Sequence, residues 1–450
     1  MRTGGRATRQ WQRSATGWRR FVGVTGFVLL MLSGLLAPSV QATGAVEAPD
    51  GHGFLLVADT VERRLYVYRV PDMVLTGALD NVLLGAHLGT LALPDGRILL
   101  SDDAAKEILA LRIDDGVPVV VNRTAATLGR RAVWGSTDPG FQYFAVASEI
   151  ENSDDQVVNL IDLQTFENTQ VPVKMQADEE AHPYLGEQPL TLFVGLGGVM
   201  QSYAVADLIR QGSAAPTSET VIDLGAHGLV ISPKASRLGI STRAGFNVVD
   251  TNYAALGSTV NIPWDIDGRA GGQNIRPRLA RDGVTALGAI AGPVAAPEQW
   301  ADTPQDIHVL NLQTLEAHRF RLGNGIVPRF ALSKAFAVFV TVHPYGDELH
   351  LLDVRPKSKT YLKRTGTVDL EQLSNGPVAG QPTVGREARF VAVTPDGRYA
   401  FATHGGDGKI SVIDTATLSV TQVVVPTTLT GGGYITAVQP GVRVVDLIAR

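Results

Sequence analysis

The chain has 450 residues, a formal net charge of −5 and no cysteine. The lack of cysteine excludes disulfides, thiol catalysis, cysteine-ligated zinc and iron–sulfur clusters. An acidic balance argues against nucleic acid and anionic membrane surfaces as partners. The 48 glycines, 24 prolines and 18% charged residues are typical of short strands joined by tight turns.

The first 42 residues read as a secretory signal peptide. Six arginines and no acidic residue come first, an apolar run from Phe21 to Ala37 follows, and small residues stand at Val40 and Ala42. A membrane anchor is the alternative, but this run is short for a span and is broken by Gly and Ser. We therefore predict cleavage after Ala42 and a periplasmic or secreted protein. Arg19-Arg20 leaves the choice between the general and the twin-arginine export route open.

Cleavage leaves residues 43–450 as a single predicted domain. Its net charge becomes −11, because the removed segment carries six arginines and no carboxylate. No later apolar run approaches the length of a membrane span, so we expect no membrane association after cleavage.

A short apolar segment between turn residues recurs eight times after the signal. The eight copies begin at Phe54, Arg97, Gln142, Leu190, Arg237, Val284, Ala335 and Arg398. A period in the forties made of short strands is typical of a β-propeller, with one four-stranded blade per repeat. The sequence thus predicts an all-β, WD40-like fold with eight blades. Seven blades is the alternative if the irregular unit at Gly186 to Gly212 is not a full blade.

Turn residues support the same organisation. Pro-Asp-Gly-Arg precedes the recurring strand at Pro94 and again at Pro395, which suits a tight hairpin. The next strand ends in a residue that can bond the backbone two positions on, as in Asp162, Asn311 and Asp414.

The last two repeats match each other best, and the chain ends with a spare strand. With one residue of slack, the paired positions are Arg329 with Arg389, His343 with His404, and Asp353 with Asp414. The first repeat begins without an inner strand, whereas Tyr434 to Pro440 forms an extra one near the end. We predict that this C-terminal strand completes the N-terminal blade and removes an exposed sheet edge.

The last repeat, ARFVAVTPDGRYAFATHGGDGKISVIDTATLSV, resembles the YVTN repeat of the secreted, lactonase-like propeller superfamily. The opening FLLVADTVERRLYVYRV and the central GAHGLVIS are also similar to periplasmic zinc-metallochaperone propellers. The resemblance implies a propeller fold and, from the second group, zinc as a cofactor. Those chaperones carry a His- and Asp-rich metal loop, which this sequence lacks.

Histidines are the first candidate site. Five fall in turns that should open on one face of the propeller, and they are the predicted metal ligands: His87, His182, His227, His343 and His404. Imidazole suits zinc, and a nearby aspartate would complete the shell. The alternative, which the lack of close ligand spacing favours, is that each histidine caps a turn or faces solvent in its own blade.

Arginines are the second candidate site. Four begin inner strands and one lies in an outer turn, and together they are the predicted ligand-binding residues: Arg243, Arg276, Arg278, Arg329 and Arg389. Guanidinium groups at a channel mouth favour a carboxylate or phosphate ligand. The alternative is that they bridge neighbouring blades.

No nucleophile elbow, zincin motif, phosphate loop or dinucleotide fingerprint occurs, so we predict no catalytic residue. The leading hypothesis is a monomeric, non-enzymatic binding propeller whose channel face takes a metal, a small anion or a protein partner. A zinc metallochaperone and a lactonase-like hydrolase are the alternatives.

Overall fold

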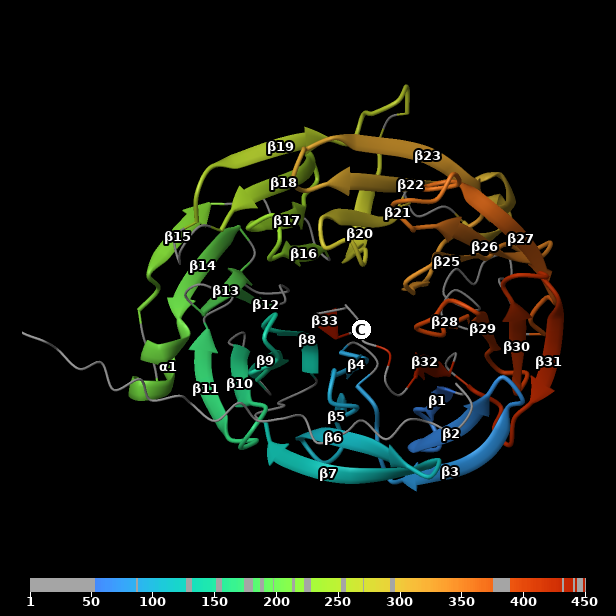
Figure 1. Cartoon of the computed structure of the whole chain (residues 1–450), viewed down its shortest axis with the longest axis horizontal. Coiled ribbons are helices and arrows are strands. Elements are labelled where there is room, and N and C mark those ends of the chain that lie inside the picture. Colours follow the sequence, from blue (N-terminus) through green and yellow to red (C-terminus); the bar gives the residue numbers. More distant parts are fainter. Residues whose placement is uncertain are drawn as a thin grey trace, which may run out of the picture. The chain divides into compact units, whose positions relative to one another are not determined.

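The repeated apolar segments form antiparallel strands in a ring of eight blades (Figure 1). The computed structural model describes residues 53–85, 88–126, 132–150, 156–173, 181–186, 190–196, 198–212, 215–221, 228–251, 256–269, 271–291, 296–374, 389–430, 433–439, 442 and 448–449. The predicted all-β propeller is confirmed. The irregular unit at Gly186 to Gly212 belongs to a full blade, so the ring has eight blades and not seven.

Blades are numbered here in chain order, and their strands are given from the axis outward. Blade 1 has β32 (Tyr434–Val438), β1 (Gly53–Asp59), β2 (Arg64–Val70) and β3 (Val74–Asp80). Blade 2 has β4 (Thr90–Ala92), β5 (Ile98–Asp102), β6 (Glu107–Asp114) and β7 (Val117–Ala125). Blade 3 has β8 (Ala132–Thr137), β9 (Tyr143–Glu149), β10 (Gln156–Asp162) and β11 (Asn168–Val173), with β33 (Ile448–Ala449) as a fifth strand on its inner edge. Blade 4 has β12 (His182–Gly186), β13 (Thr191–Leu196), β14 (Val199–Ala204) and β15 (Ser218–Val221).

The second half of the ring repeats this order. Blade 5 has β16 (Leu229–Ser232), β17 (Arg237–Ser241), β18 (Gly245–Asp250) and β19 (Thr259–Pro263). Blade 6 has β20 (Gln273–Leu279), β21 (Thr285–Ala291), β22 (Pro304–Asn311) and β23 (Ala317–Asn324). Blade 7 has β24 (Phe330–Leu332), β25 (Phe336–Thr341), β26 (Asp347–Asp353) and β27 (Arg364–Leu370). Blade 8 has β28 (Val391–Val393), β29 (Tyr399–His404), β30 (Lys409–Asp414) and β31 (Val420–Val424).

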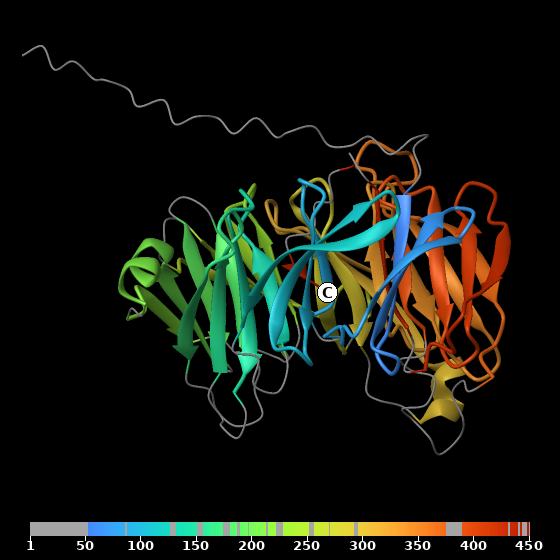
Figure 2. The same ribbon diagram turned by 90° about the horizontal axis from the view of Figure 1, so that it is seen from below.

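Within the described part of the chain, two short helical segments interrupt the strands, α1 (Val205–Gln211) in blade 4 and η3 (Pro297–Asp302) in blade 6. Figure 2 shows the blades edge-on, with their strands running between the two faces of the ring. Within the described residues, no helix is long and apolar enough to cross a membrane. The predicted signal peptide lies outside those residues and stays a prediction.

The predicted turn chemistry is present. Gly96 and Gly397 adopt φ angles of +87° and +81°, which glycine tolerates at no steric cost, at the hairpins between first and second strands. One carboxylate oxygen of Asp162 accepts hydrogen bonds from the backbone N–H of Gln164 and Thr165, at 2.7 and 2.9 Å. Asn311 and Asp414 repeat this bond pattern in their own blades. Short polar side chains therefore fix the turns between third and fourth strands.

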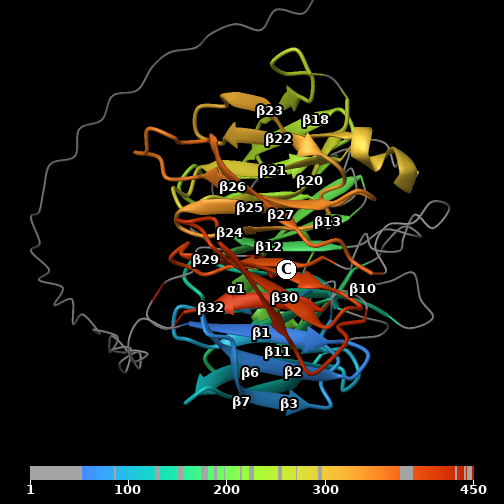
Figure 3. The ribbon, with the colours of Figure 1, turned by 90° about the vertical axis from the view of Figure 1, so that its right-hand side faces the viewer.

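The chain closes the ring as predicted. Strand β32 pairs antiparallel with β1 from Phe54 opposite Val438 to Ala58 opposite Tyr434. The two strands lie side by side in Figure 3, although they are separated by nearly the whole chain. Blade 1 thus takes strands from both ends of the described chain, and β1 has no exposed inner edge.

The core is divided among the seams between blades. Seven clusters of buried apolar side chains each draw on neighbouring blades, and together they cover all eight seams. One of them joins blades 8, 1 and 2 through Phe401, Leu55 and Leu100, which are almost fully buried. Contacts between blades therefore supply the apolar burial that a single four-stranded sheet lacks.

The alignment of the last two blades is corrected by the strand register. Asp353 opposite Phe336 and Asp414 opposite Tyr399 confirm the predicted aspartate pair. Counted from these anchors, Arg329 corresponds to Phe390 and not to Arg389. A shift of one residue turns a side chain to the other face of a strand.

In the same way, His404 is the sixth residue of β29 and corresponds to Thr341, the sixth residue of β25. His343 lies two residues beyond Thr341, in the turn after β25. The predicted equivalence of the two histidines is therefore wrong.

Candidate functional site

One register position of the inner strands recurs around the axis, and we call it the rim position. It is the residue opposite the fifth residue of the second strand. Trp134 lies opposite Ala147 in blade 3, and His182 opposite Gly195 in blade 4. In blades 7 and 8 the same position falls on Arg329 and Phe390, each one residue before its inner strand.

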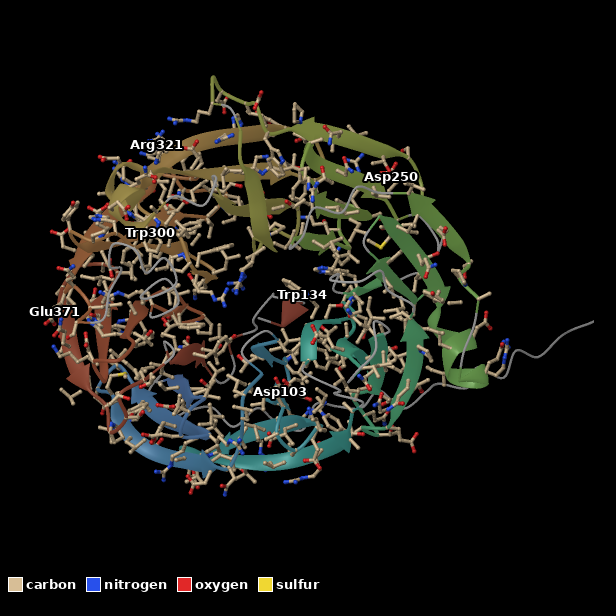
Figure 4. The ribbon with its side chains drawn as sticks, turned by 180° about the vertical axis from the view of Figure 1, so that it is seen from behind. Asp103, Trp134, Asp250, Trp300, Arg321 and Glu371 are labelled. Carbon is tan, nitrogen blue, oxygen red and sulfur yellow. The ribbon has the colours of Figure 1, made fainter. Side chains whose placement is uncertain are left out.

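Rim-position side chains contact one another across the seams. The rings of Trp134 and His182 are 4.7 Å apart between centroids, and the guanidinium carbon of Arg329 lies 5.2 Å from the ring centroid of Phe390. The Phe390 ring is 5.6 Å from that of Tyr434 in blade 1, which lies opposite Ala58, one residue beyond the rim position. Figure 4 shows Trp134 near the axis, whereas Asp250, Arg321 and Glu371 lie toward the outer edge.

The phenol of Tyr434 extends the contacts to blade 2, because its oxygen accepts a hydrogen bond from the backbone N–H of Thr90 at 3.2 Å. Side chains and backbone from blades 7, 8, 1 and 2 are therefore in continuous contact beside the axis. The cation–π contact of Arg329 is worth about 0.5–2 kcal/mol, depending on how far it is desolvated.

A second arginine, Arg278, lies on the inner strand of blade 6, two register positions along the strand from the rim position. Arg278 in β20 faces Leu287, the third residue of β21, and its guanidinium carbon is 5.4 Å from the ring centroid of Phe330. Arg278 and Arg329 are both half-buried. Burial raises the pKa of the Tyr434 phenol, and the positive charges of both arginines oppose that rise. Two cations from blades 6 and 7 thus act on one phenol of blade 1.

Arg389 is a bridge between blades rather than a part of this group. Its Nε lies 2.7 Å from Oδ2 of Asp347 in blade 7, and both side chains are shielded from solvent. It also donates hydrogen bonds to the backbone oxygens of Thr403 and Glu371. Burial raises the pKa of Asp347 and the charge of Arg389 opposes that rise. Arg389 therefore bridges neighbouring blades, which was the alternative to ligand binding for the five arginines.

The other two predicted arginines lie apart or outside the description. Arg243 is exposed in the turn after β17 of blade 5. Arg276 belongs to β20, but its side chain lies outside the described residues. Of the five arginines, Arg278 and Arg329 are the two that both act electrostatically on the Tyr434 phenol.

The five predicted metal ligands are dispersed. His87 and His227 lie outside the described residues. His182 is buried against Trp134. His343 is half-buried, and its Nδ1 accepts a hydrogen bond from the backbone N–H of Tyr345 at 3.3 Å.

His404 is fully buried, and its Nε2 lies 2.7 Å from Oγ of Ser411. Its Nδ1 is also buried and has no hydrogen-bond partner in the described part of the chain. Burial and the nearby charge of Arg389 lower the pKa of His404 to about 4. The nearby carboxylates of Glu371 and Asp407 oppose this lowering of the pKa.

Across the described residues, no three His, Asp or Glu side chains are grouped so as to hold a metal ion. Zinc ligation by the five histidines stays a prediction.

Two further histidines are buried in third strands. Burial, aided by the charge of Arg319, lowers the pKa of His308 to about 4. Burial and the charge of Arg364 have the same effect on His350, whose Nε2 lies 3.0 Å from Oγ1 of Thr341. These rings are neutral parts of the core at pH 7.

Sequence reasoning missed Trp134, Phe390 and Tyr434. Each of these aromatic residues looks like an ordinary core residue of a β-strand in the sequence. The signal that would have found them is the strand register. Aligning the second strands on their partners Asp162, Asp353 and Asp414 places Trp134, Arg329 and Phe390 at one position.

Comparison with known proteins gives similarity of structure alone. No family model matches the chain, and no curated protein matches it. The structure of apo AztD from Citrobacter koseri aligns with a TM-score of 0.61 and 13% identity, covering 87% of this chain and 99% of AztD. The dihydro-heme d1 dehydrogenase NirN in complex with DHE gives 0.56 and 15%, covering 90% of this chain and 79% of NirN. The C-terminal WD40 domain of Sif2 gives 0.51 and 10%, covering 83% and 93%.

The structural alignments show that the folds are alike. At sequence identities this low they leave the activity of this chain open. The resemblance to propellers noted in the sequence is confirmed at the level of the fold: this chain is an eight-bladed β-propeller of the WD40-like kind.

Proposed function

We propose that the protein is a non-enzymatic binding propeller that acts after export and takes a small organic anion beside the axis. The observation that carries this proposal is the placement of Arg278 and Arg329. They come from adjacent blades, are half-buried, and both act electrostatically on Tyr434 of a third blade. A carboxylate or phosphate ester is the ligand class that paired guanidinium groups recognise.

Aromatic contacts support the geometry of this site. The guanidinium carbons of Arg278 and Arg329 lie 5.4 and 5.2 Å from the ring centroids of Phe330 and Phe390. Stacking on a ring holds each side chain in place, so less rotamer freedom is lost when an anion binds. The structural neighbour NirN was solved in complex with DHE, which supports the proposal of a ligand site.

Calorimetric titration with citrate and with inorganic phosphate tests the proposal. We expect citrate to bind the protein, and the Arg278→Gln/Arg329→Gln variant to bind it at least tenfold more weakly. The loss of charge-assisted hydrogen bonds of about 1.5–3 kcal/mol each sets that size. The matched control is Arg112→Gln/Arg210→Gln, which removes the same charge from two exposed ion pairs away from the axis. The proposal would be contradicted if citrate did not bind, or if the Arg278→Gln/Arg329→Gln variant bound it as tightly as the control variant.

Zinc binding is the second candidate, carried by the resemblance to zinc-chaperone propellers in the sequence. His87 and His227, which stand in the matching phrases LGAHLG and LGAHGL, are the first ligands to test. Zinc titration of the protein and of the His87→Ala/His227→Ala variant, with His318→Ala as control, separates the two functions. Stoichiometric zinc that is lost in the double variant alone would favour the metal site over the anion site.

A further inference from the structure

Blade 3 differs from the other blades because a fifth strand lies on its inner edge. Strand β33 pairs antiparallel with β8, with Ile448 opposite Ser136 and Ala449 opposite Gly135. The other seven sheets formed by the described residues have four strands each. Figure 1 shows β33 inside the ring, on the axial side of β8.

This strand lies at the same level along the axis as Arg278. Ser136 faces Ala145, the third residue of β9, and Arg278 faces Leu287, the third residue of β21. Ser136 and Arg278 therefore occupy equivalent positions along the inner strands of blades 3 and 6. Because Ile448 pairs with Ser136, β33 lies within the ring at the level of Arg278.

The attachment of β33 is short. Two ladder residues contribute net hydrogen-bond stabilisation of about 0.5–1.5 kcal/mol each, whereas ordering a residue's backbone costs about 1–2 kcal/mol. These two contributions largely offset each other, so backbone pairing by itself holds the strand weakly, and a ligand that favours one state can shift it.

We propose that β33 is a displaceable occupant of the axis, which regulates the anion site by competing with the ligand. The inference rests on the proposed function. The strand enters the ring from blade 3 and Arg278 enters it from blade 6 at the same level, so an anion held by Arg278 and the docked strand compete for one level of the axis. Anion binding then favours the undocked state. The apparent affinity for the anion is the intrinsic affinity multiplied by the fraction of protein in which β33 is undocked.

The absence of native cysteine gives a direct test. In Ala449→Cys the thiol is the single one in the protein, and its rate of modification by a maleimide reports how often β33 is undocked. We expect modification to be slower than in the urea-unfolded chain and to rise at least about threefold with saturating citrate. The same substitution combined with Arg278→Gln/Arg329→Gln is expected to show no rise. A citrate-independent or slower rate in the presence of bound citrate would overturn the inference.

A second variant separates this inference from the proposed function. A chain that ends at Gly441 keeps β32 but lacks β33, and we expect it to bind citrate several-fold more tightly than the full chain. Equal citrate affinity of the two chains would contradict the competition by β33 but not the anion site. If neither chain bound citrate, the proposed anion site itself would be wrong. A thiol at position 449 that reacts at the unfolded rate both with and without citrate overturns the inference by itself.

Discussion

Arg389 of blade 8 and Asp347 of blade 7 form an ion pair across a blade seam, with Nε and Oδ2 2.7 Å apart and neither side chain exposed to solvent. The remaining donors of Arg389 bond backbone oxygens of Thr403 and Glu371. Such a pair is costly to break on one side, because the partner is left as an uncompensated buried charge.

Replacing Arg389 by Met should therefore lower the free energy of unfolding by about 3–5 kcal/mol in urea denaturation. Adding Asp347→Leu should recover most of this loss, since no buried charge then remains. The control is Arg112→Met, which breaks an exposed pair with Asp114 and should cost less than about 1 kcal/mol. A single-variant cost similar to that of the control would show that the pair is not stabilising the seam.

Two hairpin glycines provide a matched pair with the same backbone strain. Gly96 and Gly397 both have a left-handed φ, but a Cβ at Gly96 meets nothing within 4 Å, whereas at Gly397 it lies 2.7 Å from Cβ of Ala335. Alanine at Gly96 should cost about 1–2 kcal/mol for the backbone alone. Alanine at Gly397 should cost a further 1–3 kcal/mol, roughly, for overpacking against blade 7. Equal costs in thermal or urea unfolding would contradict the close contact between these blades.

Ring closure depends on the apolar side chains of β32. Ile435 is 4% exposed in the cluster that joins blades 8, 1 and 2, so Ile435→Ala should lower the free energy of unfolding by about 2–5 kcal/mol. Val424→Ala on the outer strand of blade 8, where the side chain is 79% exposed, should stay within about 0.5 kcal/mol. A neutral Ile435→Ala would mean that closure of blade 1 contributes little to stability.

Buried histidines should make the protein sensitive to mild acid. The pKa values of His308, His350 and His404 are lowered to about 4, against about 6.5 in an unfolded chain. Between these values the unfolded chain binds protons that the folded protein excludes. Stability is therefore fully present above about pH 6.5, is lost as the pH falls toward 4, and levels off below that.

Each histidine should contribute up to about 1.4 kcal/mol per pH unit to this slope. His350→Gln should flatten the pH dependence of the free energy of unfolding, measured in urea from pH 7 to pH 4.5. The control is Val338→Ala, which should lower stability equally at every pH because it changes no ionisable group. A slope that survives His350→Gln unchanged would show that this ring is not the proton site assigned to it.

Much of the fold was predictable from local chemistry. The Pro-Asp-Gly-Arg turns, the aspartates that cap the third strands and the spare strand after Tyr434 depend on short-range backbone preferences and on the repeat itself. These signals survive in the sequence because every blade needs them. The candidate site was less predictable, since Arg329 and Arg389 look alike in the chain and differ in structure by one step of strand register.

Turn residues and alternating apolar segments act locally, and they predicted the all-β class, eight blades with seven as the alternative, and the closure of blade 1 by the C-terminal strand. Which charged side chains meet became known from the folded ring alone. Arg389 turns into a seam and pairs with Asp347, while Arg278 and Arg329 lie beside the axis near Tyr434. The sequence likewise did not predict that β33 lies on the inner edge of blade 3. The physical reason is that a strand's register and its non-local partners are set by packing between blades, which residue order along one blade does not encode.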